Sequence, residues 1–231
     1  FFAGAGGLSC GFLEAGFRVC FANDFEDVCV RTYKFNHPEL SSKKVLKEDI
    51  RKIVNNISDY VTEDVDIVVG GPPCQGFSQK GKRLSLDDPR NFLFQQYVRF
   101  VEEFRPKYFV LENVPGIITT SNGYFKDEIV AAFNKLGYEV KYGVLKATDY
   151  GVPQDRHRAV FLGQLGNIEI DLPEPLNVRT TIKDAIYDLP YIASGEGEEV
   201  SKYDKKATTP YQKELRGKCK TLYNHVATKH N

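Results

Sequence analysis

The chain has 231 residues, of which 42% are hydrophobic, and this is enough for one sizeable core. Its 31 Lys and Arg balance its 31 Asp and Glu, which argues against a general polyanion binder but leaves room for a local basic patch. The sequence shows no apolar run long enough to span a bilayer and no signal peptide. Its five cysteines lack a C-x-x-C pair, which argues against a disulfide framework or a zinc site and favours a reducing cytoplasm.

Short apolar runs alternate with helical patterns over about the first 165 residues. The opening letters FFAGAGG indicate the last residues of a strand whose beginning is missing. Such alternation predicts an α/β fold with a mainly parallel sheet. The predicted strands cover 17–23, 65–71, 107–113 and 157–163, and the predicted helices cover 8–16, 26–36, 91–104 and 125–137.

The composition changes after about residue 166. The stretch DLPEPLN is a linker, and TTIKDAIYDLP indicates a short helix. From Ser194 onward the sequence is polar and charged, so we expect it to bury little. We therefore predict one domain over 1–190 and a polar segment over 191–231.

The stretch FAGAGGLSCGF has the order strand, glycine loop, helix. In a doubly wound sheet, this first turn holds a ligand against the helix N-terminus. The spacing differs from the dinucleotide pattern G-x-G-x-x-G, because Ser9 stands at the third position. Asp24, at the end of the next strand, could accept both ribose hydroxyls, and Phe25 could stack on adenine. Together they favour a nucleoside without a pyrophosphate, and S-adenosylmethionine fits; the alternative is an ordinary tight turn.

A single cysteine stands in GGPPCQGFSQ, directly after an apolar strand. Pro72 and Pro73 fix the backbone and remove two N–H donors, which limits how the Cys74 thiol is presented. Glu112 also ends a strand, and the carboxyl ends of parallel strands meet in one crevice. The sequence therefore predicts a thiol and a carboxyl group beside the nucleoside site. By contrast, Cys10, Cys20 and Cys29 are expected to be small buried hydrophobes.

The letters QDRHR precede the last predicted strand. Alternation along a strand points Arg156 and Arg158 to one side, where two guanidiniums would favour a thiolate or bond a carbonyl oxygen. The alternative is that they pair with Asp149 or Asp155, and that Glu112 is a surface charge.

In this order and spacing, FAGAGG, GGPPCQGFSQ, ENV and QDRHR resemble the motifs of the cytosine-5 DNA methyltransferases, and NDF, EDI and DDPRNFLF agree. The resemblance covers about residues 1–190. It implies a class I, Rossmann-like methyltransferase fold with helices on both faces of the sheet, which binds S-adenosylmethionine and flips a cytosine out of the duplex.

The resemblance also implies a role for each motif residue. Cys74 would attack carbon 6 of cytosine, and Glu112, carrying a proton, would bond ring nitrogen 3. Arg156 would bond the ring carbonyl, and Arg158 would help hold the Cys74 and Glu112 geometry. The segment 75–90 would be a loop that closes over DNA through Lys80, Lys82 and Arg83. The cofactor pocket would be lined by Phe2, Gly4, Gly6, Gly7, Asp24, Phe25, Asp49, Ile50, Pro73 and Leu93.

Two features depart from the family pattern. Phe1 and Phe2 stand where an acidic residue usually ends the first strand, and the target-recognition region and last two motifs do not occur before Asn231. The resemblance implies double-stranded DNA as the partner, a cognate restriction endonuclease in the same modification system, a monomer, and the cytoplasm of a bacterial or phage-infected cell.

Three other functions compete with this interpretation. A tRNA cytosine-5 methyltransferase would share the chemistry, but such enzymes typically carry QPFT after the cysteine, whereas this sequence has QGFS. A non-catalytic regulatory homologue would tend to lose the cysteine or the glycine loop, and both are intact. The glycine spacing argues against a nicotinamide-dependent dehydrogenase.

Overall fold

The computed structural model describes residues 1–73, 93–166, 168 and 170–230. Its contacts divide the chain into two compact units. The first comprises Phe1–Leu145 with His157–Pro173, and the second comprises Lys146–Arg156 with Glu174–Asn231. The predicted division into a catalytic domain (1–190) and a polar segment (191–231) is functional and differs from this division by contacts. It stays a prediction.

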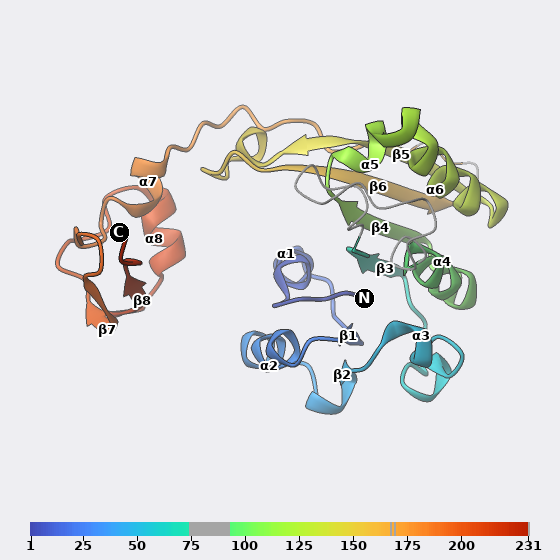
Figure 1. Ribbon diagram of the computed structural model, residues 1–231, viewed down its shortest axis with the longest axis horizontal. Helices are drawn as coiled ribbons and strands as arrows, with labels where there is room; N and C mark the ends of the chain where they lie inside the picture. Colours follow the sequence, from blue (N-terminus) through green and yellow to red (C-terminus); the bar gives the residue numbers. More distant parts are fainter. Residues whose placement is uncertain (74–92, 167, 169, 231) are drawn as a thin grey trace. The chain divides into compact units, whose positions relative to one another are not determined.

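The first unit contains the strands expected of an α/β fold. β1 (Ala22–Asp24) pairs in parallel with β2 (Val45–Lys47). A second sheet has the strand order β3-β4-β6-β5 (Figure 1). Its members are β3 (Ile67–Gly70), β4 (Tyr108–Asn113), β6 (His157–Leu165) and β5 (Tyr138–Lys146). β3 and β4 run parallel, whereas β6 runs antiparallel to β4, so the sheet is mixed.

The first three residues connect these two sheets. The Phe1 amino group donates to the Val69 carbonyl at 2.8 Å, and the Ala3 amide donates to the Asn23 carbonyl at 2.9 Å. This segment therefore lies between β1 and β3, where Figure 1 also places the N-terminus. The glycine loop follows directly, so it lies at the carboxyl end of β1.

Six α-helices of the first unit are described. The four predicted ones are confirmed with shifted ends, and α3 and α5 are additional short helices. Their bounds are α1 Gly7–Glu14, α2 Asp27–Asn36, α3 Ile50–Ile53, α4 Leu93–Phe104, α5 Gly116–Thr119 and α6 Tyr124–Lys135. α4 places Tyr97, Phe100 and Val101 in the core because these positions share one face of the helix.

The core of the first unit is aromatic. The Phe109 ring on β4 stacks on Phe133 of α6 with their centroids 3.8 Å apart, and both side chains are fully buried. The Tyr97 hydroxyl lies 2.8 Å from the Val68 carbonyl and 2.9 Å from the Val110 carbonyl. Burial raises the pKa of Tyr97 well above its usual value, so the hydroxyl keeps the proton it shares with these acceptors. These contacts fix β3 and β4, whose ends carry the predicted site.

The second unit is built from short elements. α7 (Ile182–Ile186) is the predicted short helix, and α8 (Pro210–Arg216), β7 (Gly197–Lys202) and β8 (Thr221–Val226) follow. β7 and β8 pair antiparallel. As expected, the segment from Ser194 onward buries little: among its described residues only Gln212, at 1% exposed, and Leu222, at 8% exposed, are buried. Gln212 is buried although it is polar, because its side chain makes hydrogen bonds.

One sequence expectation about the cysteines is wrong. Cys10 is exposed, and Cys20 and Cys29 are only partly buried. Cys10 lies on the outer side of α1, where its thiol is 3.5 Å from Glu14 Oε1. Within the described parts of the chain, no helix is long and apolar enough to cross a membrane.

Candidate active site

The glycine loop joins the end of the first extended segment to α1. Gly4 and Gly6 have φ values of +55° and +94°, in the left-handed region that favours glycine. The Gly4 amide donates to Asp24 Oδ2 at 2.8 Å, and the Glu26 amide donates to Asp24 Oδ1 at 2.9 Å. Asp24 is therefore held in place by backbone donors on both sides, and each of its oxygens keeps capacity for a further donor.

A cavity of about 470 Å³ opens beside Asp24. Among the predicted cofactor residues, it is lined by Phe2, Asp24, Phe25, Asp49, Ile50, Pro73 and Leu93. Its remaining walls are Asn23, Glu26, Glu48, Arg51 and Gly71. Gly4, Gly6 and Gly7 are not among the lining residues. Phe25 is 65% exposed, so its ring can form one open wall of the cavity.

Two polar residues shape this cavity from β1 and α3. Asn23 is buried and donates to the Leu46 and Glu48 carbonyls at 3.2 and 2.8 Å, which ties the end of β1 to the end of β2. Asp49 caps α3 by accepting from the Arg51 amide at 2.9 Å. The Arg51 side chain also binds Asp49 and lowers the pKa of that carboxyl group. The sequence singled out Asp49 but missed Asn23, whose contacts are with backbone atoms.

The charge of the lining indicates the kind of ligand. Asp24, Glu26, Glu48 and Asp49 supply four carboxylates, and Arg51, already paired with Asp49, is the one cation among the described lining residues. Such a wall repels phosphate groups and attracts a cation. S-adenosylmethionine carries a sulfonium and an ammonium group and no phosphate, so these residues fit it better than a dinucleotide.

The second part of the site is at the carboxyl end of β4. Arg158 Nε lies 2.6 Å from Glu112 Oε1, and each side chain is 29% exposed. The contact arises because β6 is antiparallel to β4, which places the start of β6 beside the end of β4, with Glu112 opposite Val160. The sequence predicted that these two residues act together, although it did not predict the strand direction that joins them.

The turn that leads to Cys74 is tied to the same strand end. A Cβ on Gly71 would lie 3.0 Å from Glu112 Oε2, so this oxygen faces a position without a side chain. Buried Asn113 donates from Nδ2 to the Pro72 carbonyl at 2.8 Å and accepts from the Val114 amide at 2.9 Å. Because Gly71 also lines the cavity, the Glu112 carboxyl group and the cavity share this turn. Asn113 is a further site residue that sequence reasoning did not identify.

Several predicted residues are not placed in this arrangement. Cys74, Lys80, Lys82 and Arg83 lie outside the described residues. Arg156 belongs to the second unit and precedes β6 by one residue. There its carbonyl accepts from the Ala147 amide at 2.9 Å, and its amide donates to the Gln154 carbonyl at 2.8 Å.

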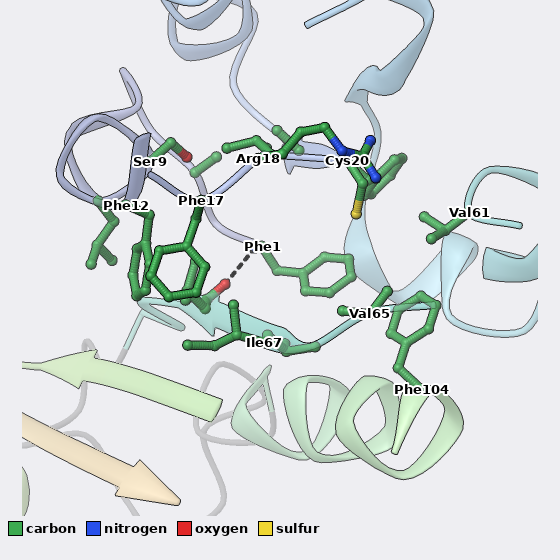
Figure 2. Close-up of a pocket in the computed structure, with 18 of the residues that line it drawn as sticks. Phe1, Ser9, Phe12, Phe17, Arg18, Cys20, Val61, Val65, Ile67 and Phe104 are labelled. Carbon is green, nitrogen blue, oxygen red and sulfur yellow. Dashed lines mark hydrogen bonds between the residues drawn. The ribbon is translucent and has the colours of Figure 1, made fainter. Parts of the chain in front are cut away.

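A second, apolar cavity of about 150 Å³ is lined in part by the first extended segment. Figure 2 shows Phe1, Phe12, Phe17, Cys20 and Phe104 around it. The dashed line marks the hydrogen bond from the Phe1 amino group to the Val69 carbonyl of β3. No carboxylate is among its described lining residues, so it does not suit a cationic ligand. We find no cluster of metal-ligating side chains in the described parts of the chain.

The glycine loop, the acidic cavity and the polar groups at the strand ends define a Rossmann-like α/β protein of the S-adenosylmethionine-dependent methyltransferase type. The family model for C-5 cytosine-specific DNA methylases matches residues 1–230. The chain therefore belongs to the C-5 cytosine-specific DNA methylase family.

Its relatives include type II methyltransferases. The chain is 43% identical to M.DdeI of Desulfomicrobium norvegicum, over 99% of this chain and 57% of that protein. It is 44% identical to M1.HphI of Haemophilus parahaemolyticus, over 84% of this chain and 53% of that protein. A solved structure described as a DNA modification methyltransferase encoded within an Escherichia coli prophage aligns with a TM-score of 0.74 and 29% identity. This alignment covers 97% of this chain and 64% of the solved one. The chain spans little more than half the length of the two type II methyltransferases.

Proposed function

We propose that this protein transfers a methyl group from S-adenosylmethionine to carbon 5 of a cytosine flipped out of double-stranded DNA. The observation that carries the proposal is the Arg158–Glu112 pair at the end of β4. Through Gly71 it adjoins both the acidic cavity and the turn into Cys74. A carboxyl group, a guanidinium and a thiol beside a nucleoside cavity are what activation of a pyrimidine ring requires.

The chain's own residues would activate the base as follows. Carbon 5 of cytosine is a poor nucleophile, and the Cys74 thiolate would correct this by forming a bond to carbon 6. A proton held between Glu112 and ring nitrogen 3 would draw electrons away from carbon 6 and assist this attack. Arg156 would bond the ring carbonyl, and Arg158 would hold the Glu112 carboxyl group in register through Oε1.

When bound, S-adenosylmethionine would supply an electrophilic methyl group and would leave as S-adenosylhomocysteine, whose sulfur keeps the electron pair of the broken bond. Asp24 would orient it by accepting from its ribose, Phe25 would cover its adenine, and Asp49 and Ile50 would border the same cavity. Gly4, Gly6 and Gly7 would contribute by shaping the loop that positions Asp24. To complete the reaction, a base takes the carbon 5 hydrogen as a proton and the bond to Cys74 breaks, which returns the electron pair to the thiolate.

The proposal extends to the biological setting. Relatives named type II methyltransferases support a role in DNA modification alongside a cognate restriction endonuclease in the cytoplasm of a bacterial or phage-infected cell. We propose that the catalytic and cofactor-binding domain covers 1–190, that 191–231 leads toward a target-recognition region, and that the protein acts as a monomer.

The first test is a methyl-transfer assay. The purified protein is incubated with S-adenosylmethionine labelled in the methyl group, and label is counted in unmethylated duplex DNA and in tRNA side by side. Label recovered as 5-methylcytosine in DNA supports the proposal, and label in tRNA alone moves the substrate to RNA. Cys74→Ser should abolish transfer and retain cofactor binding, whereas unchanged turnover in this variant would refute the covalent mechanism.

A further inference from the structure

The end of α2 makes two hydrogen bonds to the glycine loop and one to α1. His37 Nε2 lies 3.0 Å from the Gly6 carbonyl oxygen, and Asn36 Nδ2 donates to the neighbouring Ala5 carbonyl at 2.9 Å. One turn earlier, the Tyr33 hydroxyl donates to Ser9 Oγ of α1 at 2.7 Å. One helix end therefore holds both the loop and the first turn of the helix that follows it.

The His37 contact is the most constrained of the three. His37 is 3% exposed, and its ring lies against the Tyr33 ring with their centroids 4.4 Å apart. A Cβ on Gly6 would lie 2.0 Å from His37 Nε2, so the ring occupies the space that a side chain at Gly6 would need. Because a carbonyl oxygen only accepts, Nε2 carries the hydrogen of this bond. Its other ring nitrogen, Nδ1, lies 3.2 Å from Glu39 Oε1.

The segment just before α2 also contacts the loop. Asp24 and Glu26, just before α2 begins, line the acidic cavity, and Asp24 accepts from the Gly4 amide. The loop is therefore held at Gly4 by a cavity residue and at Gly6 by a residue that does not line the cavity. A loop fixed at both points loses little conformational freedom when a ligand binds.

We propose that His37 is a positioning residue for cofactor binding. It holds the Gly6 carbonyl so that Gly4 presents its amide to Asp24, and so keeps the loop in the ligand-ready conformation. His37 itself touches no ligand. The inference rests on the proposed function, because it takes the acidic cavity beside the loop to be the S-adenosylmethionine site.

The test is a titration of the purified protein with S-adenosylmethionine in a calorimeter, without DNA. His37→Phe keeps a ring against Tyr33 but removes the Gly6 and Glu39 contacts, and we expect affinity to fall about tenfold, which corresponds to about 1.4 kcal/mol. His37→Gln places an amide nitrogen near the position of Nε2 and should bind within about threefold of the wild type. His37→Asn places its amide nitrogen near Nδ1, toward Glu39 only, and should bind as weakly as His37→Phe.

Two controls separate the possible failures. Phe35→Ala changes an 86% exposed side chain in the same turn of α2 and should leave affinity unchanged. Asn36→Ala removes the neighbouring Ala5 contact and gives a second, milder probe if His37→Phe does not fold. Equal affinity of the wild type, His37→Phe and Asn36→Ala, with Asp24→Ala clearly weakened, would overturn the inference and leave the proposed function standing. No binding by the wild type would overturn the cofactor assignment itself.

Discussion

In the first unit, most of the residues with no exposed surface are aromatic, among them Tyr97, Phe109 and Phe133, whereas in the second unit the buried residues include the polar Gln212 and Asp188. Burial of apolar surface is non-directional and tolerates small shifts of the backbone. A buried polar group depends on each of its hydrogen-bond partners. The strand that carries Glu112 is therefore held mainly by packing, while the second unit depends more on specific polar contacts.

Phe109→Ala should give the largest effect on stability. Phe109 is fully buried, stacks on Phe133 at 3.8 Å and fills the space left by Gly163, so truncation leaves a large cavity. We expect the free energy of unfolding to fall by about 4 kcal/mol. Urea denaturation measures this, with Phe35→Ala at an exposed position as the matched control. A loss below about 1 kcal/mol would contradict the view that aromatic packing holds this unit.

Glu112→Gln should separate activity from stability in the same unit. The change removes the charge that faces Arg158 Nε at 2.6 Å but keeps the shape of the side chain. We expect single-turnover methyl transfer to slow by about 10² to 10³, as for the loss of one strong polar catalytic contact. Asp66→Asn is a matched change at the exposed Asp66–Lys107 pair and should leave the rate unchanged. A near wild-type rate for Glu112→Gln would refute its role toward ring nitrogen 3.

Gln212→Ala tests the polar interior of the second unit. Gln212 Oε1 accepts from the Thr208 and Thr209 amides at 2.8 and 3.3 Å, and Nε2 donates to the Lys183 carbonyl at 3.2 Å. Truncation removes the fully buried side chain that these partly buried groups bind, so we expect a loss of about 2 kcal/mol. Hydrogen exchange should show faster exchange in α7 and α8, with affinity for S-adenosylmethionine unchanged. Gln95→Ala, at an exposed position of α4, is the control. Equal exchange of α7 and α8 in the two variants would contradict the view that the hydrogen bonds of Gln212 hold the second unit.

The difference between the units also explains what could be predicted from the sequence. Within the runs 65–71 and 107–113, the centres 67–69 and 109–111 are continuously apolar, and both runs contain a strand with buried residues. The same reasoning missed β5, where Glu139 and Lys141 interrupt the apolar pattern, and the β7–β8 pair, where Glu198 and Glu199 suggest a solvated tail. Apolar burial leaves a periodic signal in the sequence, whereas the pairing of largely exposed strands such as β7 and β8 does not.

The site follows the same rule. Asp24 and Glu112 could be proposed because their motifs place carboxylates at strand ends. Asn113 and His37 could not, because each contacts a backbone carbonyl of a segment distant in sequence, Pro72 and Gly6. Backbone carbonyls are present at every residue, so the sequence carries no mark of which one is bound.

Of these variants, Thr181→Ala should have the smallest measurable effect on the free energy of unfolding. It tests whether polar contacts support the second unit. Thr181 and Asp184 form a capping box at α7, in which the Asp184 amide donates to Thr181 Oγ1 at 3.2 Å and the Thr181 amide donates to Asp184 Oδ2 at 2.8 Å. α7 has five residues and no buried side chain, so this cap replaces packing as its local support. We expect a loss of about 1 kcal/mol at neutral pH.

The pH dependence of this loss distinguishes a capping box from an exposed ion pair. The hydrogen bonds from Thr181 lower the pKa of Asp184 below its usual value of 3.8. The contribution of Asp184 is therefore fully present above that pH and is lost as the pH falls through its folded-state pKa. Denaturation at pH 7 and near pH 3 should show the difference between Thr181→Ala and the wild type shrinking with acid. Lys107→Ala breaks an exposed ion pair of the first unit and should change the free energy of unfolding little at pH 7. If Lys107→Ala lost more stability at pH 7 than Thr181→Ala, polar contacts would not be a special support of the second unit.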